Sequence, residues 1–157
     1  MLPCSPGWIN SSSRMPTMPL TNSFKTIVEF GDCDPARKVF YPNYFKWFDT
    51  GTRHFFVANG FPLWPGLRRT SGIDGAPLVD ASAKFFASVT YGDEIEIETS
   101  IQECGGKSFT MRHRIRRGET ILVEGREVRV FVAADPVDPG RIRAVSVPTE
   151  VRALCSG

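Results

Sequence analysis

Alternating apolar and polar positions predict β-strands along much of the chain, chiefly after residue 75. Six segments are extended candidates: residues 24–31, 76–89, 93–104, 107–117, 119–135 and 141–148. In residues 107–117 the alternation places a histidine, His113, on the apolar face. Gly125 interrupts the segment 119–135, where a glycine indicates a β-bulge. The pattern thus predicts consecutive antiparallel strands.

One segment follows the period of a helix instead. Between residues 42 and 60 the apolar positions recur at spacings of three and four, which predicts a helix of roughly 18 residues with one buried face. Pro42 suits its first position, and Gly60 suits its end. The apolar stripe comprises Tyr44, Phe45, Phe48, Thr52, Phe55 and Phe56.

These elements predict the α+β fold class, with one long helix against an antiparallel sheet. The stripe of the helix needs an apolar partner, and a face of the sheet provides it. Long antiparallel strands also leave an unpaired edge, which favours an oligomer. Residues 32–40 and 61–77 are rich in Gly, Pro or polar residues and predict loops, and residues 148–157 predict a short helical tail.

The organisation of the chain is simple. Residues 1–22 are rich in Pro and Ser and predict a flexible N-terminal tail, and residues 23–157 predict a single domain. The tail lacks the continuous apolar core of a signal peptide, and no apolar run reaches the roughly 20 residues that cross a bilayer. The wide spacing of the cysteines predicts free thiols and a cytoplasmic protein. These cysteines are Cys4, Cys33, Cys104 and Cys155.

The charge of the chain argues against a polyanionic partner. A formal net charge of +2 over 157 residues predicts no nucleic-acid groove. Positive charge gathers only in "RHRIRR", where a strand would send Arg112, Arg114 and Arg116 to one face. Such a face is typical of a solvated surface, and a phosphate-bearing ligand is the alternative.

The candidate chemistry begins at the loop before the helix. A helix N terminus exposes unpaired N–H groups and a partial positive charge, which stabilise a developing oxyanion. Because Pro42 has no N–H, the predicted free donors are those of Tyr41, Asn43 and Tyr44. Asp34 lies seven residues upstream of Tyr41, where a turning loop brings a carboxylate near a polarised carbonyl. That combination favours hydrolysis of an activated acyl group, and a plain turn residue is the alternative.

Two further residues near this loop are candidates. Asp49 lies along the predicted apolar stripe, so its carboxylate needs either a nearby backbone or arginine partner or a polar group on a ligand. Cys33 is a weaker candidate for a nucleophile, because neither His54 nor His113 lies beside it in the sequence. Two histidines and four scattered cysteines show no metal-ligand spacing, so we expect no metal.

The segment "GGKS", residues 105–108, predicts a tight turn. Lys107, Ser108 and the backbone amides of such a turn suit a phosphate group. An ordinary hairpin turn is the alternative, since the glycine pair alone favours it.

The segment "VEFGDCDPARKVFYPNYFKWFD" resembles the signature of the 4-hydroxybenzoyl-CoA thioesterase family, D-P-A-G-x-V-x-Y/F-P-N-Y/F. The similarity continues through "KSFTMRH", "VRVF" and "RIRAVSVP", from residue 24 to the end. It implies the hotdog fold, in which an antiparallel sheet wraps around a long central helix. It also implies dimers with active sites at the subunit interface, which usually assemble into tetramers.

The resemblance also implies roles for single residues. Asp34 matches the catalytic carboxylate, and the N–H of Tyr41 matches the donor that polarises the thioester carbonyl. Asp49 falls where aryl-specific members contact the 4-hydroxyl of the ring. The positions associated with the nucleotide and phosphates of CoA are Lys107, Ser108 and Arg143.

The chain departs from the family pattern at two places. Arg37 and Lys38 replace the usual Gly-Ile of the loop, and Gly105-Gly106 stands where a similar member has arginines. We hypothesise that Arg37 or Lys38 has taken over part of the phosphate binding.

The sequence therefore predicts a thioesterase that hydrolyses an aromatic acyl-CoA, either 4-hydroxybenzoyl-CoA or benzoyl-CoA, without a metal or redox cofactor. Three alternatives stay open: a hotdog protein that binds acyl-CoA without hydrolysing it, a thioesterase for short aliphatic acyl-CoA, and a hotdog dehydratase. A dehydratase usually needs a histidine in its site. Neither His54 nor His113 lies near the loop of Asp34 in the sequence, which argues against this alternative.

Overall fold

A computed structural model describes residues 20–62 and 64–155, and its two sheets are both antiparallel. The strands of the larger sheet lie in the order β1 (Thr21–Ile27), β4 (Glu94–Cys104), β5 (Ser108–Arg117), β6 (Thr120–Val130) and β3 (Leu78–Phe85). The smaller sheet contains β2 (Ile73–Gly75), β7 (Val132–Ala134) and β8 (Ile142–Ala144). The helices are α1 (Pro42–Ala58), α2 (Trp64–Ser71) and α3 (Thr149–Cys155), with a 3-10 turn η1 at Phe30–Asp32.

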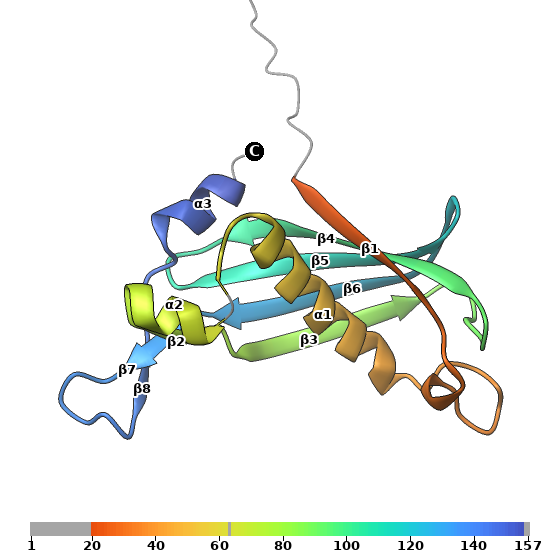
Figure 1. Ribbon diagram of the computed structural model, residues 1–157, viewed down its shortest axis with the longest axis horizontal. Helices are drawn as coiled ribbons and strands as arrows, with labels where there is room; N and C mark the ends of the chain where they lie inside the picture. The colour runs from red at the N-terminus through yellow and green to blue at the C-terminus, as the bar shows by residue number, and fades with distance from the viewer. Residues whose placement is uncertain (1–19, 63, 156–157) are drawn as a thin grey trace, which may run out of the picture.

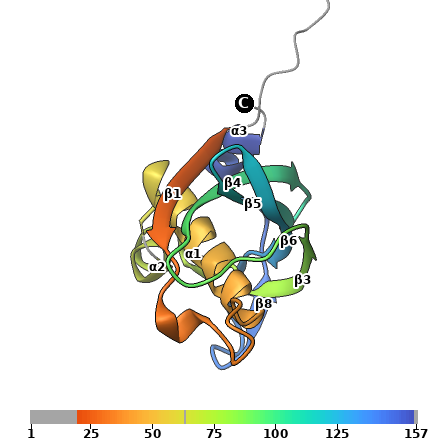
Figure 2. The same cartoon turned by 90° about the vertical axis from the view of Figure 1, so that its right-hand side faces the viewer.

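The long helix α1 lies in the concave face of the larger sheet (Figure 1), and the strands curve around it when seen nearly end-on (Figure 2). The predicted α+β class and the helix from Pro42 are confirmed. Gly60, with φ 83°, follows the end of α1. The N–H of Phe61 donates to the carbonyl of Phe56 at 3.0 Å, and that of Gly60 to Val57 at 3.1 Å. This Schellman arrangement pairs the last carbonyls of the helix.

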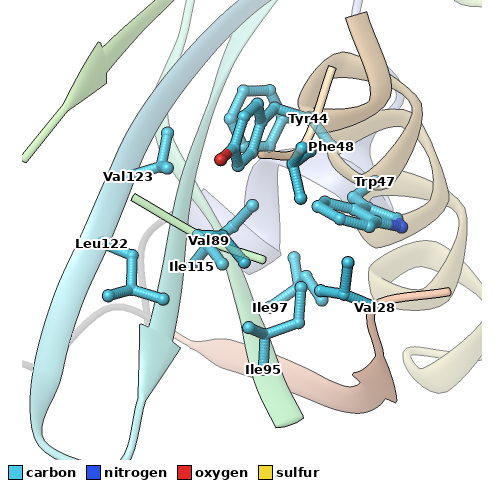
Figure 3. Packing of buried hydrophobic residues seen from close by; sticks show 11 residues of the cluster. Val28, Tyr44, Trp47, Phe48, Val89, Ile95, Ile97, Ile115, Leu122 and Val123 are labelled. Atoms are coloured by element: carbon cyan, nitrogen blue, oxygen red, sulfur yellow. The ribbon is translucent and has the colours of Figure 1, made fainter. Parts of the chain in front are cut away.

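The apolar stripe of α1 packs as predicted. Tyr44, Phe48 and Phe55 are buried, and Phe45 is half-buried. One cluster joins the first half of α1 to the start of β4 and the end of β5 (Figure 3). A second cluster surrounds the end of α1 and includes Phe109 and Phe131. The helix is therefore held along its whole length by side chains of the sheet.

Two glycines let α1 approach the sheet. A Cβ on Gly51 would overlap with Thr99 Oγ1, and a Cβ on Gly125 would overlap with the ring of Phe48. The predicted β-bulge at Gly125 is absent. Gly125 pairs in register with Ala83 of β3 on one side and with His113 of β5 on the other. The irregularity between β5 and β6 lies elsewhere, between Ile115 and Arg116. The glycine at this position makes room for a helix side chain instead.

Two other predictions are wrong. The segment 61–77 is not a loop throughout, because it contains α2 and β2. Its Pro65 stands in the first turn of α2, where proline needs no hydrogen-bonding N–H. Cys104 and Cys155 are not free thiols but form a disulfide, with Cα atoms 6.3 Å apart. The fold brings together the end of β4 and the end of α3, which are 51 residues apart in the sequence.

Part of the predicted tail lies outside the described residues. Of residues 1–22, the structure describes Leu20 to Asn22, and β1 already begins at Thr21. Within the described part of the chain, no helix is long and apolar enough to cross a membrane.

Candidate active site

The loop before α1 is a short hairpin. Cys33 and Val39 form an isolated antiparallel bridge, and the N–H of Asp34 donates to the carbonyl of Lys38 at 2.8 Å. The N–H of Arg37 donates to the carbonyl of Asp34, also at 2.8 Å, and Arg37 has φ 61°. Since few residues other than glycine adopt that conformation, the turn is held by its hydrogen bonds. The hairpin returns the chain, so the hairpin and the start of α1 lie at the same end of the molecule (Figure 1).

Asp34 is half-buried at the turn of this hairpin. Its Oδ1 accepts the N–H of Ala36 at 2.8 Å, and Oδ2 has no hydrogen-bond partner among the described residues. The side chain lines a hollow of about 520 Å³, to which Phe30 and Tyr91 contribute aromatic walls. Arg37 lines the same hollow. One carboxylate oxygen is thus fixed by the turn while the other is available to a ligand.

The N terminus of α1 has fewer free donors than the sequence predicts. The N–H of Asn43 donates to the carbonyl of Phe40 at 2.9 Å, and that of Tyr44 to Tyr41 at 3.2 Å. Pro42 has no N–H at all. Of the three predicted donors only the N–H of Tyr41 finds no acceptor within residues 20–62 and 64–155. The structure therefore reduces the candidate oxyanion donors to the one at Tyr41.

Beside this N terminus lies a second hollow of about 360 Å³, lined by Tyr41, Tyr44, Phe85 and Phe86 among others. Burial, together with the nearby Cys33, raises the pKa of Tyr44 to about 12, so its phenol stays neutral. Cys33 is free and half-buried, and its Sγ lies 4.0 Å from the carbonyl oxygen of Glu29.

A chain of polar side chains crosses the core beneath the middle of α1. His113 Nδ1 lies 3.0 Å from Thr99 Oγ1, and its Nε2 lies 3.3 Å from Glu127 Oε2. Glu127 Oε2 also accepts from Thr52 Oγ1 at 3.1 Å and from Arg129 Nε at 3.1 Å. Arg129 Nη2 then donates to an oxygen of Asp49 at 2.7 Å. We call His113, Glu127, Arg129 and Asp49 the inner network.

Burial and charge act against each other in this network. Burial lowers the pKa of His113, and this outweighs the hydrogen bond to Glu127, so the imidazole is neutral. Since a carboxylate only accepts, Nε2 carries the proton toward Glu127. Burial alone would raise the pKa of Glu127, but hydrogen bonds from His113 and Arg129 lower it. Burial is likewise overcome at Arg129, whose pKa is raised by Glu127 and Asp49.

The sequence predicts that Asp49 is buried along the apolar stripe, and this prediction is wrong. Its side chain is 68% exposed, because it stands at the edge of the stripe rather than under it. The predicted arginine partner is present and is Arg129, which lies on β6, 80 residues further along the chain. One oxygen of Asp49 is therefore paired, and the other faces no hydrogen-bond donor among the described residues.

Three of the predicted CoA-binding residues, Lys107, Ser108 and Arg143, lie far from Asp34. "GGKS" forms a tight turn between β4 and β5, in which the N–H of Gly105 donates to the carbonyl of Ser108 at 2.7 Å. Lys107 is exposed there, and its carbonyl accepts the N–H of Phe131, which precedes β7. β7 pairs with β8, which carries the exposed Arg143. Lys107, Ser108 and Arg143 thus share one end of the molecule.

The hairpin with Asp34, Arg37 and Lys38 lies at the other end (Figure 1). Between the two ends runs α1, whose 17 residues span about 25 Å. A single chain therefore brings Arg37 and Lys38, but not Lys107, Ser108 or Arg143, beside the candidate catalytic carboxylate.

The arginines of "RHRIRR" take the solvated face that alternation predicts. Arg112 Nη2 and Arg114 Nε contact Glu124 Oε1 at 2.8 and 3.1 Å, and Arg116 contacts Glu98 at 3.1 Å. These arginines are thus paired with acidic neighbours on the outer face of the sheet.

Glu127 and Arg129 are the residues near the site that the sequence analysis missed. Alternation along residues 119–135 places both on the same face as Val123, which is buried. Two charged residues on an apolar face of a strand indicate a buried ion pair, so the signal was present. The sequence did not reveal that Arg129 pairs with Asp49 on α1, because no local pattern links residue 49 to residue 129.

Metal chemistry has no ready ligand set here. Within the described residues, no group of three or more His, Cys, Asp or Glu side chains lies close enough to hold a metal ion.

Comparison with known proteins identifies the family. The family model described as "Thioesterase-like superfamily" matches residues 28–154. The chain belongs to the thioesterase-like superfamily. It is thus an enzyme of the thioester-hydrolase class, with the hotdog fold that the sequence resemblance implies.

Individual relatives agree with this assignment. The chain is 41% identical over 134 residues to a 4-hydroxybenzoyl-CoA thioesterase of Pseudomonas sp. strain CBS-3, covering 82% of this chain and 93% of that protein. A crystal structure of a 4-hydroxybenzoyl-CoA thioesterase mutant with 4-hydroxybenzoyl-CoA bound superposes with a TM-score of 0.78 at 37% identity, covering 87% of this chain and 99% of the other. A gentisyl-coenzyme A thioesterase gives a TM-score of 0.72 at 34% identity, covering 87% and 100%. These relatives share the fold over almost their entire length.

Proposed function

We propose that this thioesterase hydrolyses an aromatic acyl-CoA, with 4-hydroxybenzoyl-CoA and benzoyl-CoA as the leading substrates. The proposal rests on two groups at the same end of α1: the half-buried carboxylate of Asp34 and the unbonded N–H of Tyr41. Relatives that are similar in sequence and structure include enzymes named for 4-hydroxybenzoyl-CoA and gentisyl-CoA, both aromatic thioesters.

In this proposal the thioester carbonyl lies against the N–H of Tyr41. The partial positive charge of the α1 N terminus and this single donor stabilise the oxyanion of the tetrahedral intermediate. Asp34 acts through its free Oδ2, either as a nucleophile that forms an acyl anhydride or as a base that deprotonates water. Both routes end with the free acid and the CoA thiol. Losing one oxyanion donor of this kind typically raises the barrier by about 2.7–4 kcal/mol.

Asp49 is the proposed contact for the 4-hydroxyl of the aromatic ring. Its exposed carboxylate has one oxygen without a donor, and a phenol is a good donor for it. Benzoyl-CoA lacks this hydroxyl, so the ratio of the two activities measures the contribution of Asp49.

A complete site needs a second copy of the chain. We propose a homodimer, assembling into a tetramer, because the β4–β5 turn and β8, which carry Lys107, Ser108 and Arg143, lie at the opposite end of α1 from the hairpin of Asp34. Strand β3 forms an edge of the larger sheet and exposes apolar side chains there; those of Leu78, Val79 and Phe85 are 45%, 59% and 52% exposed. An unpaired apolar edge favours pairing with the same strand of a second copy.

Phosphate binding by Lys107, Ser108 and Arg143, with help from Arg37 or Lys38, is part of the same proposal. The turn leaves little room for a side chain at position 105, because a Cβ on Gly105 would lie 2.9 Å from Ser108 Oγ. Arg37→Ala with Lys38→Ala should raise KM for acyl-CoA, and an unchanged KM would contradict their share in phosphate binding.

Hydrolysis by this route uses no metal or redox cofactor, and full activity after dialysis against EDTA tests that prediction. The cytoplasmic location was predicted partly from the expectation of free thiols. The disulfide between Cys104 and Cys155 removes that support, and the location stays a prediction.

The test is release of CoA thiol from 4-hydroxybenzoyl-CoA, benzoyl-CoA and a short aliphatic acyl-CoA. Rapid turnover of an aryl substrate, with slow turnover of the aliphatic one, supports the proposal. Preference for the aliphatic substrate would reassign the acyl group. Binding without release from any thioester would contradict hydrolysis and favour an acyl-CoA binding protein.

A further inference from the structure

We propose that Arg129 is a positioning residue that holds the Asp49 carboxylate for the 4-hydroxyl, and so sets the preference for hydroxylated over unsubstituted aromatic acyl groups. This inference rests on the proposed function and deepens it. It assigns a role to a buried residue of β6 that makes contact with Asp49 but does not itself face the substrate.

The guanidinium of Arg129 has little freedom. Its side chain is 7% exposed, and each nitrogen donates to a different acceptor. Nε donates to Glu127 at 3.1 Å, Nη1 to the carbonyl of Ala76 at 3.3 Å, and Nη2 to Asp49 at 2.7 Å. Because a guanidinium is planar, the first two contacts determine where Nη2 points.

Asp49, in contrast, is fixed by nothing else. It stands on an exposed edge of α1, where a carboxylate would normally sample several rotamers. The contact from Arg129 is the only hydrogen bond to its side chain among the described residues. A charge-assisted bond of 2.7 Å selects one rotamer and leaves the second oxygen free in a defined position. That is the geometry a bound hydroxyl needs.

The rest of the inner network supports Arg129 from behind. Glu127 is 1% exposed and receives hydrogen bonds from Thr52, His113 and Arg129 on one oxygen. Its negative charge offsets that of the guanidinium, and the neutral His113 adds none. The remaining negative charge therefore lies at the exposed end, on Asp49. A ring with a hydrogen-bond donor at this position is favoured, and one with an anionic substituent is repelled.

A purely structural role for Arg129 predicts something different. Arg129 joins β6 to α1, and loss of a clamp between sheet and helix would impair every substrate alike. A positioning role affects only substrates that carry the hydroxyl. The ratio of kcat/KM for 4-hydroxybenzoyl-CoA to that for benzoyl-CoA separates the two.

The experiment measures that ratio in the wild type and in Arg129→Met. We expect a fall of roughly tenfold, the effect of losing one charge-assisted hydrogen bond. The loss should appear mainly in KM, since the hydroxyl contact exists in both the ground and transition states. Arg129→Lys keeps the charge but not the fork of donors, so its ratio should lie between the two. In an Asp49→Ala background, Arg129→Met should change the ratio no further.

Arg112→Met is the matched control, because it removes an arginine–glutamate pair from the outer face of the same sheet. It should leave the ratio unchanged. An equal loss for both substrates in folded Arg129→Met would overturn the proposal, as would an unchanged ratio. If Arg129→Met does not fold, Arg129→Lys decides, and an unchanged ratio there overturns it. A wild type that hydrolyses neither aryl substrate would instead refute the proposed function, and this proposal with it.

Discussion

Strands β5 and β6 place similar pairs of ionisable residues on both faces of one sheet. On the outer face, Arg112 and Arg114 pair with Glu124, whose side chain is 29% exposed. On the inner face, Arg129 and His113 pair with Glu127, which is 1% exposed. The distances are alike, between 2.8 and 3.3 Å, but the environments are not.

The difference shows that burial, rather than the pairing itself, decides how much such a contact contributes to stability and how firmly it fixes a side chain. Water and salt compete with the outer pairs, which contribute little to stability. The inner groups have lost their water, so each depends on its partners. Buried charged groups are also held in place by their partners. Arg129 on the inner face can therefore hold Asp49 in a fixed geometry, which the exposed arginines of the outer face cannot do.

The largest expected effect comes from breaking the inner network. Glu127→Ala leaves Arg129 without its buried counter-charge and should lower the free energy of unfolding by about 3–5 kcal/mol. Glu124→Ala on the outer face should cost about 1 kcal/mol or less. Urea unfolding of both variants measures the two values. Similar costs on the two faces would remove the basis of the comparison.

The next effect concerns acidic pH. Because the pKa of folded His113 is lowered, the unfolded chain binds a proton near the ordinary value of 6.5 while the folded chain does not. The free energy of unfolding should therefore be highest above pH 6.5 and fall below it, by up to about 1.4 kcal/mol per pH unit.

Glu127 adds a further decrease as the pH falls below its ordinary pKa of 4.5, since its pKa is lowered in the folded state. Unfolding followed from pH 8 to pH 4 should show the decrease in the wild type, and His113→Gln should flatten it between pH 7 and pH 5. A decrease of the same size in His113→Gln would assign the effect to another group.

The smallest effect sharpens the comparison from the outer side. Arg112→Met should change stability by about 0.2–1 kcal/mol, and less at 1 M salt, because exposed pairs are screened. Chemical unfolding at low and high salt tests this. A salt-independent cost above that range would mean that the outer pairs behave as buried ones.

Much of the fold could be predicted because its signals are local. The helix from Pro42 and the alternation of β4 and β5 depend on residues close together in the sequence, and both are confirmed. Contacts between distant segments left no such signal. The bond between Cys104 and Cys155 and the space that Gly125 leaves for Phe48 depend on how elements pack, which spacing alone does not reveal.

The candidate site divides in the same way. The hairpin of Asp34 and the start of α1 are contiguous in the sequence, so the sequence could predict that they share one end of the molecule. Asp49 was predicted to be buried, and its exposed position with Arg129 depends on a contact between α1 and β6, which are distant in the sequence. The separation of Lys107 from Asp34 follows from the length of α1 lying between them.

We infer that the Asp34 carboxylate, at the same end of α1 as the N–H of Tyr41, carries out thioester hydrolysis. The most direct measurement is kcat for CoA release from 4-hydroxybenzoyl-CoA by the wild type and by Asp34→Asn, which keeps the size of the side chain. Our account predicts that the variant still binds the substrate while kcat falls by at least about a hundredfold. Undiminished turnover in a folded Asp34→Asn enzyme would contradict it.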